Sequence, residues 1–210
     1  MLSLSQWYST IRRWWNYFAP SPKKFNVEAL EYREKFKPDY RKVASSLSSH
    51  LDFQTVLDVG CAQGFLMEPL HDEGFSVQGI EASEDVVEFL PDALVPRVTI
   101  GDFCEVTGHY DLVCCVEVAE HIEPARSEEL VEKLCALSNK WIYFTAAPPG
   151  QDGHGHINCR PHRHWIQWFE KHEWYVREEL TEKFRRDLDA VERTHWLRDN
   201  SFIISSQKRT

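Results

Sequence analysis

Short apolar runs alternate with amphipathic segments along most of the chain. The apolar runs predict five strands, over residues 55–60, 76–83, 97–103, 110–118 and 140–148. The run YDLVCCVEV at 110–118 is almost continuously apolar, which is typical of a strand covered on both faces. Segments with helical spacing lie between or after these strands, over residues 65–74, 84–90, 127–138 and 164–172. The alternation predicts an α/β fold with a largely parallel sheet.

The two ends of the chain add further elements. The pattern predicts helices over 27–37 and 40–51, a weak strand at 174–180, a helix at 181–198 and a last strand at 201–208. The first of these helices is expected to end before Pro38. Trp165, Trp168 and Phe169 have the spacing of a buried helix stripe.

The first 20 residues combine aromatic and basic side chains near helical spacing. This pattern predicts a short amphipathic helix that packs on the domain, with an interfacial membrane helix as the alternative. Proline and lysine residues follow it and indicate a linker. We therefore expect an N-terminal helical cap and linker over residues 1–39 and one domain over residues 40–210.

Composition narrows the class of protein. The 210 residues are 42% hydrophobic and carry a formal net charge of −9. This charge argues against a broad nucleic-acid-binding face, because a phosphate backbone requires basic surface. The six cysteines include no C-x-x-C pair, so neither a zinc ribbon nor a disulfide framework is indicated. We expect a reducing, cytoplasmic environment, and no segment approaches the length of a membrane span.

The first predicted strand ends in a glycine-rich turn, VLDVGCAQGFLM, at residues 56–67. Glycine lets the backbone turn tightly and approach a ligand, and ligands of open α/β sheets lie beyond the carboxyl ends of the strands. Asp58 is placed to orient this turn or to meet a cationic ligand group through water. Gly60, Ala62 and Gly64 follow it in a D-x-G-x-A-x-G spacing, which is not the G-x-G-x-x-G of a dinucleotide site.

The stretch VLDVGCAQGFL resembles the first motif of class I S-adenosylmethionine-dependent methyltransferases, D/E-x-G-x-G-x-G, with Ala62 at the middle glycine. The resemblance extends over residues 40–207. It implies a Rossmann-like, doubly wound sheet of seven mostly parallel strands, with the last strand antiparallel beside the fifth. It also implies that Glu81 in VQGIEAS binds the ribose hydroxyls and that Asp102 in IGDF contacts the adenine amino group. YDLVCCVEVAEH is similar to the fourth motif of the family.

Two clusters after neighbouring strands could supply the chemistry. EVAEHIE contains Glu117, Glu120 and His121, and GHGHINCRPHRHW contains His154 and His156. Both clusters should border the reacting methyl group. A neutral imidazole suits a general base, with His121 or His156 as the first candidates. Alternatively, two carboxylates and one or two imidazoles form a mixed ligand set for a divalent metal ion.

The E-x-x-E-H motif followed by a later histidine also resembles metal-dependent 2′-O-methyltransferases of small RNA 3′ ends, and ubiquinone-pathway O-methyltransferases carry a similar motif. By this resemblance the metal ligands would be Glu117, Glu120, His121 and His156. A simpler alternative is that Glu117 contacts the cofactor through its backbone while Glu120 and His121 begin a helix. His162, His164 and His172 are expected to belong to a solvated loop and the helix after it.

The sequence thus predicts an S-adenosyl-L-methionine-dependent methyltransferase of the EC 2.1.1 class. Its expected partner is a small-molecule acceptor methylated at oxygen or nitrogen, with His121, His156, Glu120 and His154 facing it. A metal-dependent RNA 2′-O-methyltransferase and a cofactor-binding, non-catalytic scaffold are the alternatives. The side chains that could cover the acceptor pocket are Tyr8, Trp14, Trp15 and Tyr32.

Overall fold

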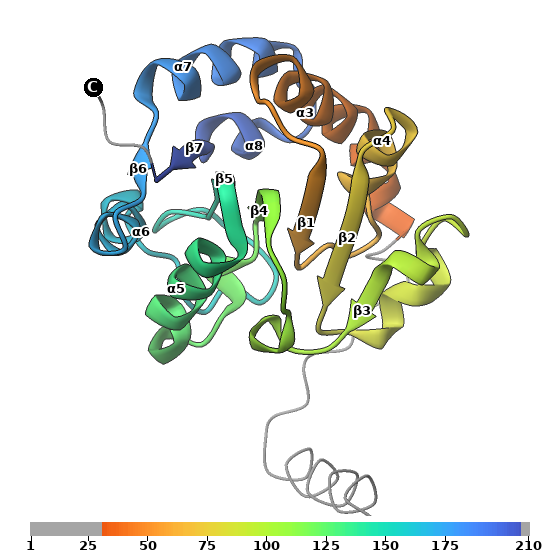
Figure 1. Cartoon of the computed structure of the whole chain (residues 1–210), viewed down its shortest axis with the longest axis horizontal. Helices are drawn as coiled ribbons and strands as arrows, with labels where there is room; N and C mark the ends of the chain where they lie inside the picture. The colour runs from red at the N-terminus through yellow and green to blue at the C-terminus, as the bar shows by residue number, and fades with distance from the viewer. Residues whose placement is uncertain (1–30, 207–210) are drawn as a thin grey trace, which may run out of the picture.

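The computed structural model describes residues 31–206 and contains one seven-stranded sheet with helices on both faces (Figure 1). The strands are β1 (Thr55–Val59), β2 (Ser76–Glu81), β3 (Val98–Ile100), β4 (Tyr110–Val116), β5 (Ser138–Thr145), β6 (Tyr175–Val176) and β7 (Phe202–Ser205). The α-helices within the described residues include α3 (Lys37–His50), α4 (Met67–Asp72), α5 (Ser127–Leu137), α6 (His162–Lys171), α7 (Glu178–Asp187) and α8 (His195–Asp199). Short 3-10 helices connect several of them.

The strand order is β3-β2-β1-β4-β5-β7-β6. β1 pairs in parallel with β2 on one side and with β4 on the other, so the chain reverses its direction of winding between β1 and β4. In an open α/β sheet this switch point is where a ligand binds, beyond the carboxyl ends of the strands. β7 pairs antiparallel with β5, which confirms the predicted doubly wound sheet with an antiparallel last strand.

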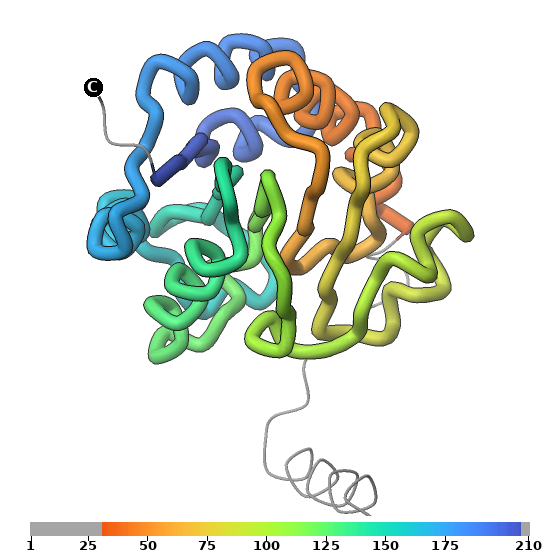
Figure 2. The backbone as a smooth tube through the Cα atoms, viewed as in Figure 1, coloured from red at the N-terminus to blue at the C-terminus, as the bar shows by residue number. Residues whose placement is uncertain are grey.

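Successive residues of each strand face opposite helical layers, as the pleat of a strand requires. Val56, Leu112 and Tyr143 point into a core shared with α3, α4, α7 and α8. Leu57 and Phe144 point into a second core shared with α5 and α6. Helix α3 lies beside α7 on the first face (Figure 2). Both faces of the central strands are therefore buried, which explains their continuous apolar sequence.

Two predicted helix boundaries are wrong. The break before Pro38 does not occur, because Pro38 lies in the first turn of α3, where a missing N–H costs no hydrogen bond. Helix α3 therefore runs across the expected domain boundary between residues 39 and 40. The helix expected over 181–198 is instead divided into α7, a 3-10 turn and α8.

Asp39 explains the division of that last helix. Its carboxylate is 3% exposed and accepts backbone N–H groups of Glu192, Arg193 and Thr194 at 2.9–3.2 Å. These N–H groups are turned toward Asp39 and are not available to the helix ladder. The burial of one acid on α3 thus decides the path of a segment more than 150 residues later.

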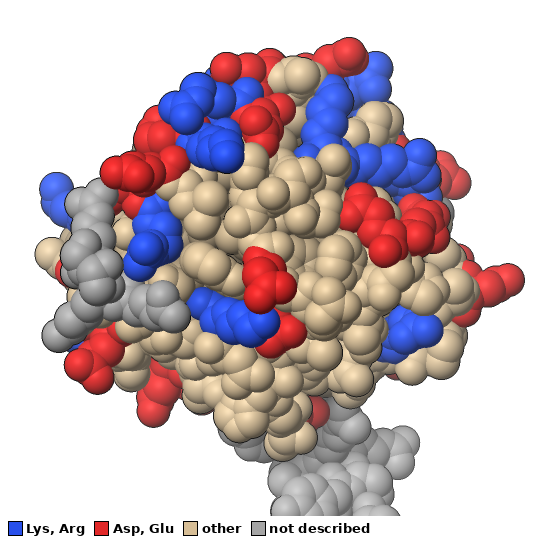
Figure 3. All heavy atoms as spheres, turned by 45° about the horizontal axis from the view of Figure 1, so that its top comes forward, with Lys and Arg blue, Asp and Glu red and all other residues tan. Residues whose placement is uncertain are grey.

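None of the helices within residues 31–206 is both long enough and apolar enough to cross a membrane. The face formed around α3 and α7 interleaves basic and acidic side chains (Figure 3). That face carries no unbroken basic area of the kind that follows a phosphate backbone. The predicted amphipathic helix in the first 20 residues lies outside the described residues.

Candidate active site

The glycine loop between β1 and α4 is held in a conformation that few residues adopt. Gly60 and Gly64 have φ values of +75° and +73°. Ala62 has φ +44°, which costs a non-glycine residue about 1–2 kcal/mol. Backbone N–H groups of Gly60 and Cys61 both donate to the Ile80 carbonyl, so β2 fixes the start of the loop.

Glu81 stabilises the strained residue of this loop. One oxygen of its carboxylate accepts the Ala62 N–H at 2.9 Å, and the other accepts the Ser83 N–H at 3.0 Å. A carboxylate offers about four acceptor positions, so one position remains on each oxygen. Two remaining acceptors on adjacent oxygens suit a pair of neighbouring hydroxyl groups, as in a ribose.

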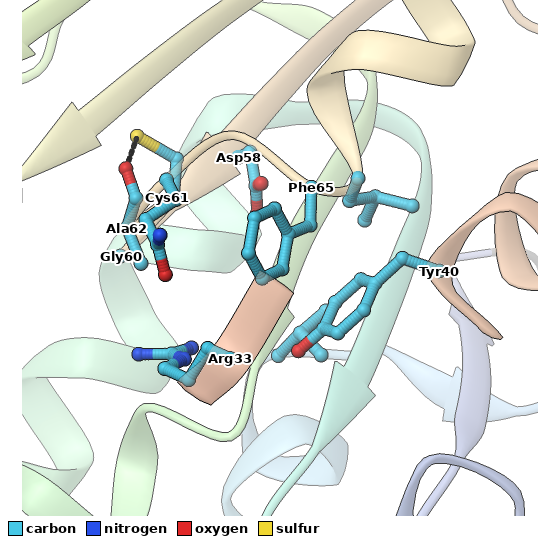
Figure 4. A pocket seen from close by; sticks show the side chains of 10 residues that line it. Arg33, Tyr40, Asp58, Gly60, Cys61, Ala62 and Phe65 are labelled. Atoms are coloured by element: carbon cyan, nitrogen blue, oxygen red, sulfur yellow. Dashed lines mark hydrogen bonds between the residues drawn. The ribbon is translucent and has the colours of Figure 1, made fainter. Parts of the chain in front are cut away.

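A small pocket opens between the loop and α3 (Figure 4). Asp58 lines it and is 4% exposed, and this burial raises the pKa of its carboxyl to about 7, with the Glu81 charge adding to the shift. Arg33 lines the same pocket, and Figure 4 shows its guanidinium on the side of Ala62. The rings of Tyr40 and Phe65 meet edge to face at 5.8 Å. A pocket lined by a buried acid and a guanidinium is a setting for a zwitterionic ligand group.

The Asp102 carboxylate lies beyond the end of β3 and is bound by Arg126 through two hydrogen bonds of 2.7 and 2.9 Å. It also accepts the Cys104 N–H at 2.9 Å. Arg126 holds the pKa of Asp102 down, to about 2. Three acceptor positions are occupied, so one remains for an exocyclic amine. Arg126 in turn bonds to Glu129 and lies 4.5 Å over the Phe103 ring.

Beyond β4 and β5, the structure brings Glu120, His121 and His156 together, with one possible ligand atom of each lying within 4.8 Å of the others. Nδ1 of His121 lies 3.1 Å from the Gly155 carbonyl, and Nδ1 of His156 lies 3.2 Å from the Gln151 carbonyl. A carbonyl only accepts, so these contacts favour the tautomer with the proton on Nδ1 in both rings, although the Cys159 Sγ also lies 3.6 Å from Nδ1 of His156. Nε2 of each ring is then left with a lone pair.

Glu120 is fully buried, and its oxygens meet no hydrogen-bond donor in bonding geometry within the described chain. Burial, with the Glu117 charge adding to it, raises the pKa of this carboxyl to about 8. Nε2 of His156 lies 3.9 Å from one of its oxygens. Desolvation lowers the pKa of His121, and the Arg33 charge contributes, so this ring is neutral near pH 7. A buried carboxyl beside two imidazole lone pairs is a setting that suits a proton or a cation.

Glu117, the fourth predicted ligand, does not join this cluster. Its backbone is left-handed, with φ +53°, and its N–H donates to the Thr145 hydroxyl. Its carboxylate accepts one hydrogen bond from Gln151 and one from Asn200. His154 is exposed and also lies outside the cluster.

Other sequence predictions have mixed outcomes. His162 is not solvated as expected, because it donates from Nε2 to the Ala146 carbonyl and lies 5.1 Å from the Phe202 ring. Trp165 and Phe169 are buried in the core as predicted. Tyr32 is 62% exposed. The other three residues proposed to cover the acceptor pocket, Tyr8, Trp14 and Trp15, lie outside the described residues.

Four residues with roles in this geometry were missed by sequence reasoning: Arg33, Arg126, Gln151 and Asn200. Arg126 had a detectable signal, because it lies three residues before Glu129 at the start of an amphipathic helix. Gln151 and Asn200 had none, since their partners lie 34 and 83 residues away in the sequence.

A family model described as a methyltransferase domain matches residues 12–186, which is most of the chain. The chain belongs to this methyltransferase family. This methyltransferase chain is similar in sequence to the chloroplastic magnesium protoporphyrin IX methyltransferase of Arabidopsis thaliana, with 30% identity over 102 residues. It is 32% identical over 108 residues to the ubiquinone biosynthesis O-methyltransferase of Paraburkholderia xenovorans. These matches cover 45% and 46% of the chain, but 33% and 46% of the relatives.

Solved structures agree with the fold of this methyltransferase. The crystal structure of magnesium protoporphyrin IX methyltransferase from Synechocystis PCC 6803 with bound SAH aligns with a TM-score of 0.61 over 93% of each chain. The plantazolicin methyltransferase BpumL aligns with a TM-score of 0.60 over 84% of this chain and 89% of its own. The sequence identities are 17% and 15%, so these likenesses show the fold alone.

Proposed function

We propose that this methyltransferase transfers a methyl group from S-adenosylmethionine to an oxygen atom of a small organic acceptor. One observation carries the proposal. The glycine loop with Glu81 and the cluster of Glu120, His121 and His156 lie at the same edge of the sheet, on both sides of the switch point. The named relatives include O-methyltransferases, which supports oxygen as the target atom.

The cofactor would lie along the strand ends in the order of the sheet. Its amino-acid part fits the pocket of Asp58 and Arg33, because the two residues offer a carboxyl and a guanidinium to its ammonium and carboxylate groups. The ribose follows at β2, where Glu81 retains two acceptor positions. The base follows at β3, where Asp102 retains one. The sulfonium supplies an already activated methyl group.

The chain's own residues then position the acceptor and take its proton. When bound, the cofactor would supply its methyl group to the acceptor oxygen and would be released as a neutral thioether. The proton of the acceptor hydroxyl passes to Nε2 of His156 or His121, both of which have a lone pair in this structure.

We further propose a divalent cation at Glu120, His121 and His156. The residues fit, because Glu120 has two unpartnered oxygens and both imidazoles have their Nδ1 protons held by backbone carbonyls, as metal-binding histidines commonly do. A bound cation would lower the pKa of an acceptor hydroxyl and so ease its deprotonation. The prediction from the sequence also named Glu117 as a ligand; its carboxylate lies outside this set of three and is held by Gln151 and Asn200.

Calorimetry tests the cofactor proposal. The full chain should bind S-adenosylhomocysteine, and Glu81→Gln should weaken binding by about tenfold to a hundredfold, since one ribose acceptor and the charge are lost. Ser83→Ala serves as a control, because its N–H remains available to Glu81. The absence of any heat with the wild type would overturn the proposed function.

Removal of metal tests the second proposal. Treatment with a chelator followed by dialysis should abolish turnover, and titration with a divalent cation should restore it. Glu120→Gln should lower the measured metal affinity more than Glu117→Gln does. Full turnover in chelated protein that contains no metal by elemental analysis would leave the imidazoles as the general bases and would end the cation proposal.

A further inference from the structure

The segment that carries His156 is anchored at two places. At one end, the backbone N–H groups of Ile157 and Asn158 both donate to the Glu120 carbonyl at 2.9 Å. Asn158 adds side-chain bonds to the Ala119 carbonyl and the Ser127 hydroxyl. This end is therefore tied to the turn after β4 by the backbone itself and does not depend on the identity of most side chains.

The other end is anchored by one backbone hydrogen bond, from the Gln151 N–H to the Pro148 carbonyl at 3.1 Å, and by side chains. Gln151 donates from its amide nitrogen to Glu117 at 3.1 Å. Asn200 uses both of its amide protons, one toward the second Glu117 oxygen at 3.2 Å and one toward the Gln151 amide oxygen at 3.0 Å. We call these three side chains the clasp. Asn200 is 2% exposed and lies just before the start of β7, so this member of the clasp is buried within the fold.

The clasp is connected to the imidazole by a single residue. The backbone carbonyl of Gln151 accepts the Nδ1 proton of His156, while the Gln151 side chain closes the clasp. The position of that carbonyl therefore depends on the side chain's contacts as well as on the backbone bond to Pro148. If the carbonyl moves, His156 loses the oxygen acceptor that keeps its proton on Nδ1 and its lone pair on Nε2, and the Cys159 thiol, 3.6 Å from Nδ1, can then donate to that nitrogen.

We propose that Gln151 and Asn200 are positioning residues that set the tautomer and place of His156 through the clasp, and that Glu117 serves the reaction as their acceptor. The proposal rests on the proposed function of the same site, but the clasp can be tested without the cofactor. It assigns roles to two amide side chains that do not touch the reacting atoms.

The polarity of the clasp can be exchanged without changing its shape. Gln151→Glu alone places a second carboxylate against Glu117, and Glu117→Gln alone places two amide nitrogens against each other. The double variant reverses donor and acceptor between the two positions: residue 117 then donates to residue 151, and Asn200 still finds an acceptor oxygen on each. All three hydrogen bonds can form again.

The tautomer of His156 is read from the nitrogen shifts of its ring in labelled, chelated, full-length protein, with His156→Asn to assign the signal. The wild type should show the proton on Nδ1. Each single variant should shift the ring toward the Nε2-protonated form, and the double variant should restore the wild-type signal. Turnover should fall about 10–100-fold in the single variants and recover in the double variant, as expected for groups that orient a functional histidine.

Two outcomes would overturn the proposal. An unchanged His156 signal in Gln151→Glu would show that the clasp does not reach the ring. Failure of the double variant to restore the signal, in protein that unfolds at the wild-type temperature, would show that Glu117 acts in its own right, for instance as a ligand. Binding of S-adenosylhomocysteine measured on the same samples keeps failure of the proposed function separate, because that failure would appear already in the wild type.

Discussion

Gly153 provides the sharpest test of the site geometry, because the His156 ring lies where a larger residue would have its Cβ. A Cβ built on Gly153 would lie 2.0 Å from Nε2, 2.1 Å from Cε1 and 2.6 Å from Cδ2 of that ring. Its φ lies outside the left-handed region, so alanine is acceptable to the backbone itself. The substitution Gly153→Ala therefore acts on one imidazole and little else.

The size of the effect follows from these distances. To reach ordinary contact at about 3.4 Å, the ring must retreat by roughly 1.4 Å from the added methyl group. A displacement of about 1 Å at a catalytic group costs on the order of 100-fold in rate. The free energy of unfolding should change by less than about 1 kcal/mol, since alanine also reduces the entropy of the unfolded chain.

The assay compares turnover, His156 nitrogen shifts and the unfolding midpoint of Gly153→Ala with those of the wild type. Asp152→Ala is the matched control, because it changes the exposed neighbour in the same loop and adds no atom near the ring. We expect a loss of about 100-fold in turnover with a midpoint within about 4 °C of the wild type. Wild-type turnover in Gly153→Ala would refute the placement of His156 at the reacting centre.

Three further predictions concern ionisable groups. Because the pKa of Asp58 is raised to about 7, binding of a cofactor ammonium beside it should ionise the carboxyl. Calorimetry at pH 6 in two buffers should detect a released proton, and Asp58→Asn should remove it; equal heats in both buffers would contradict this. The Glu120 carboxyl has its pKa raised from 4.5 to about 8, so metal-free protein should lose stability as the pH rises through this range. Glu120→Gln should be more stable than metal-free wild type at pH 8 by urea unfolding, and a lower stability would mean that the carboxylate has a partner. The pKa of Asp102 is lowered to about 2, so its bond to Arg126 stabilises the fold above pH 4 and this contribution is lost as the pH falls toward 2. Arg126→Met should cost about 1 kcal/mol at pH 7 after allowance for solvent screening, with the two unfolding curves converging in acid.

Much of the fold could be predicted from the sequence because its signals are local. The strands around Val56 and Leu112 are read from apolar runs whose length and flanking turns identify them. The strand ends carry Gly60, Gly64 and Glu81 at or within a few residues of their last positions. The direction of the strands alone therefore places these residues at the edge of the sheet where a ligand binds. The length of the last helix could not be predicted, since it is ended by Asp39 from another helix.

The chemistry of the site was decided by the tertiary structure. The sequence ranked His121 and His156 ahead of His154 but could not show which side chains meet, and the fold buries Glu120 beside His121 and His156 and leaves His154 exposed. Glu117 satisfies every local requirement for a ligand.

The Glu117 carboxylate is held by an amide 83 residues later. Sequence patterns record the spacing of neighbours, whereas a carboxylate binds whichever donors the fold brings within about 3 Å. The donors that bind the Glu117 carboxylate come close to it only once β7 has paired with β5 in the folded sheet.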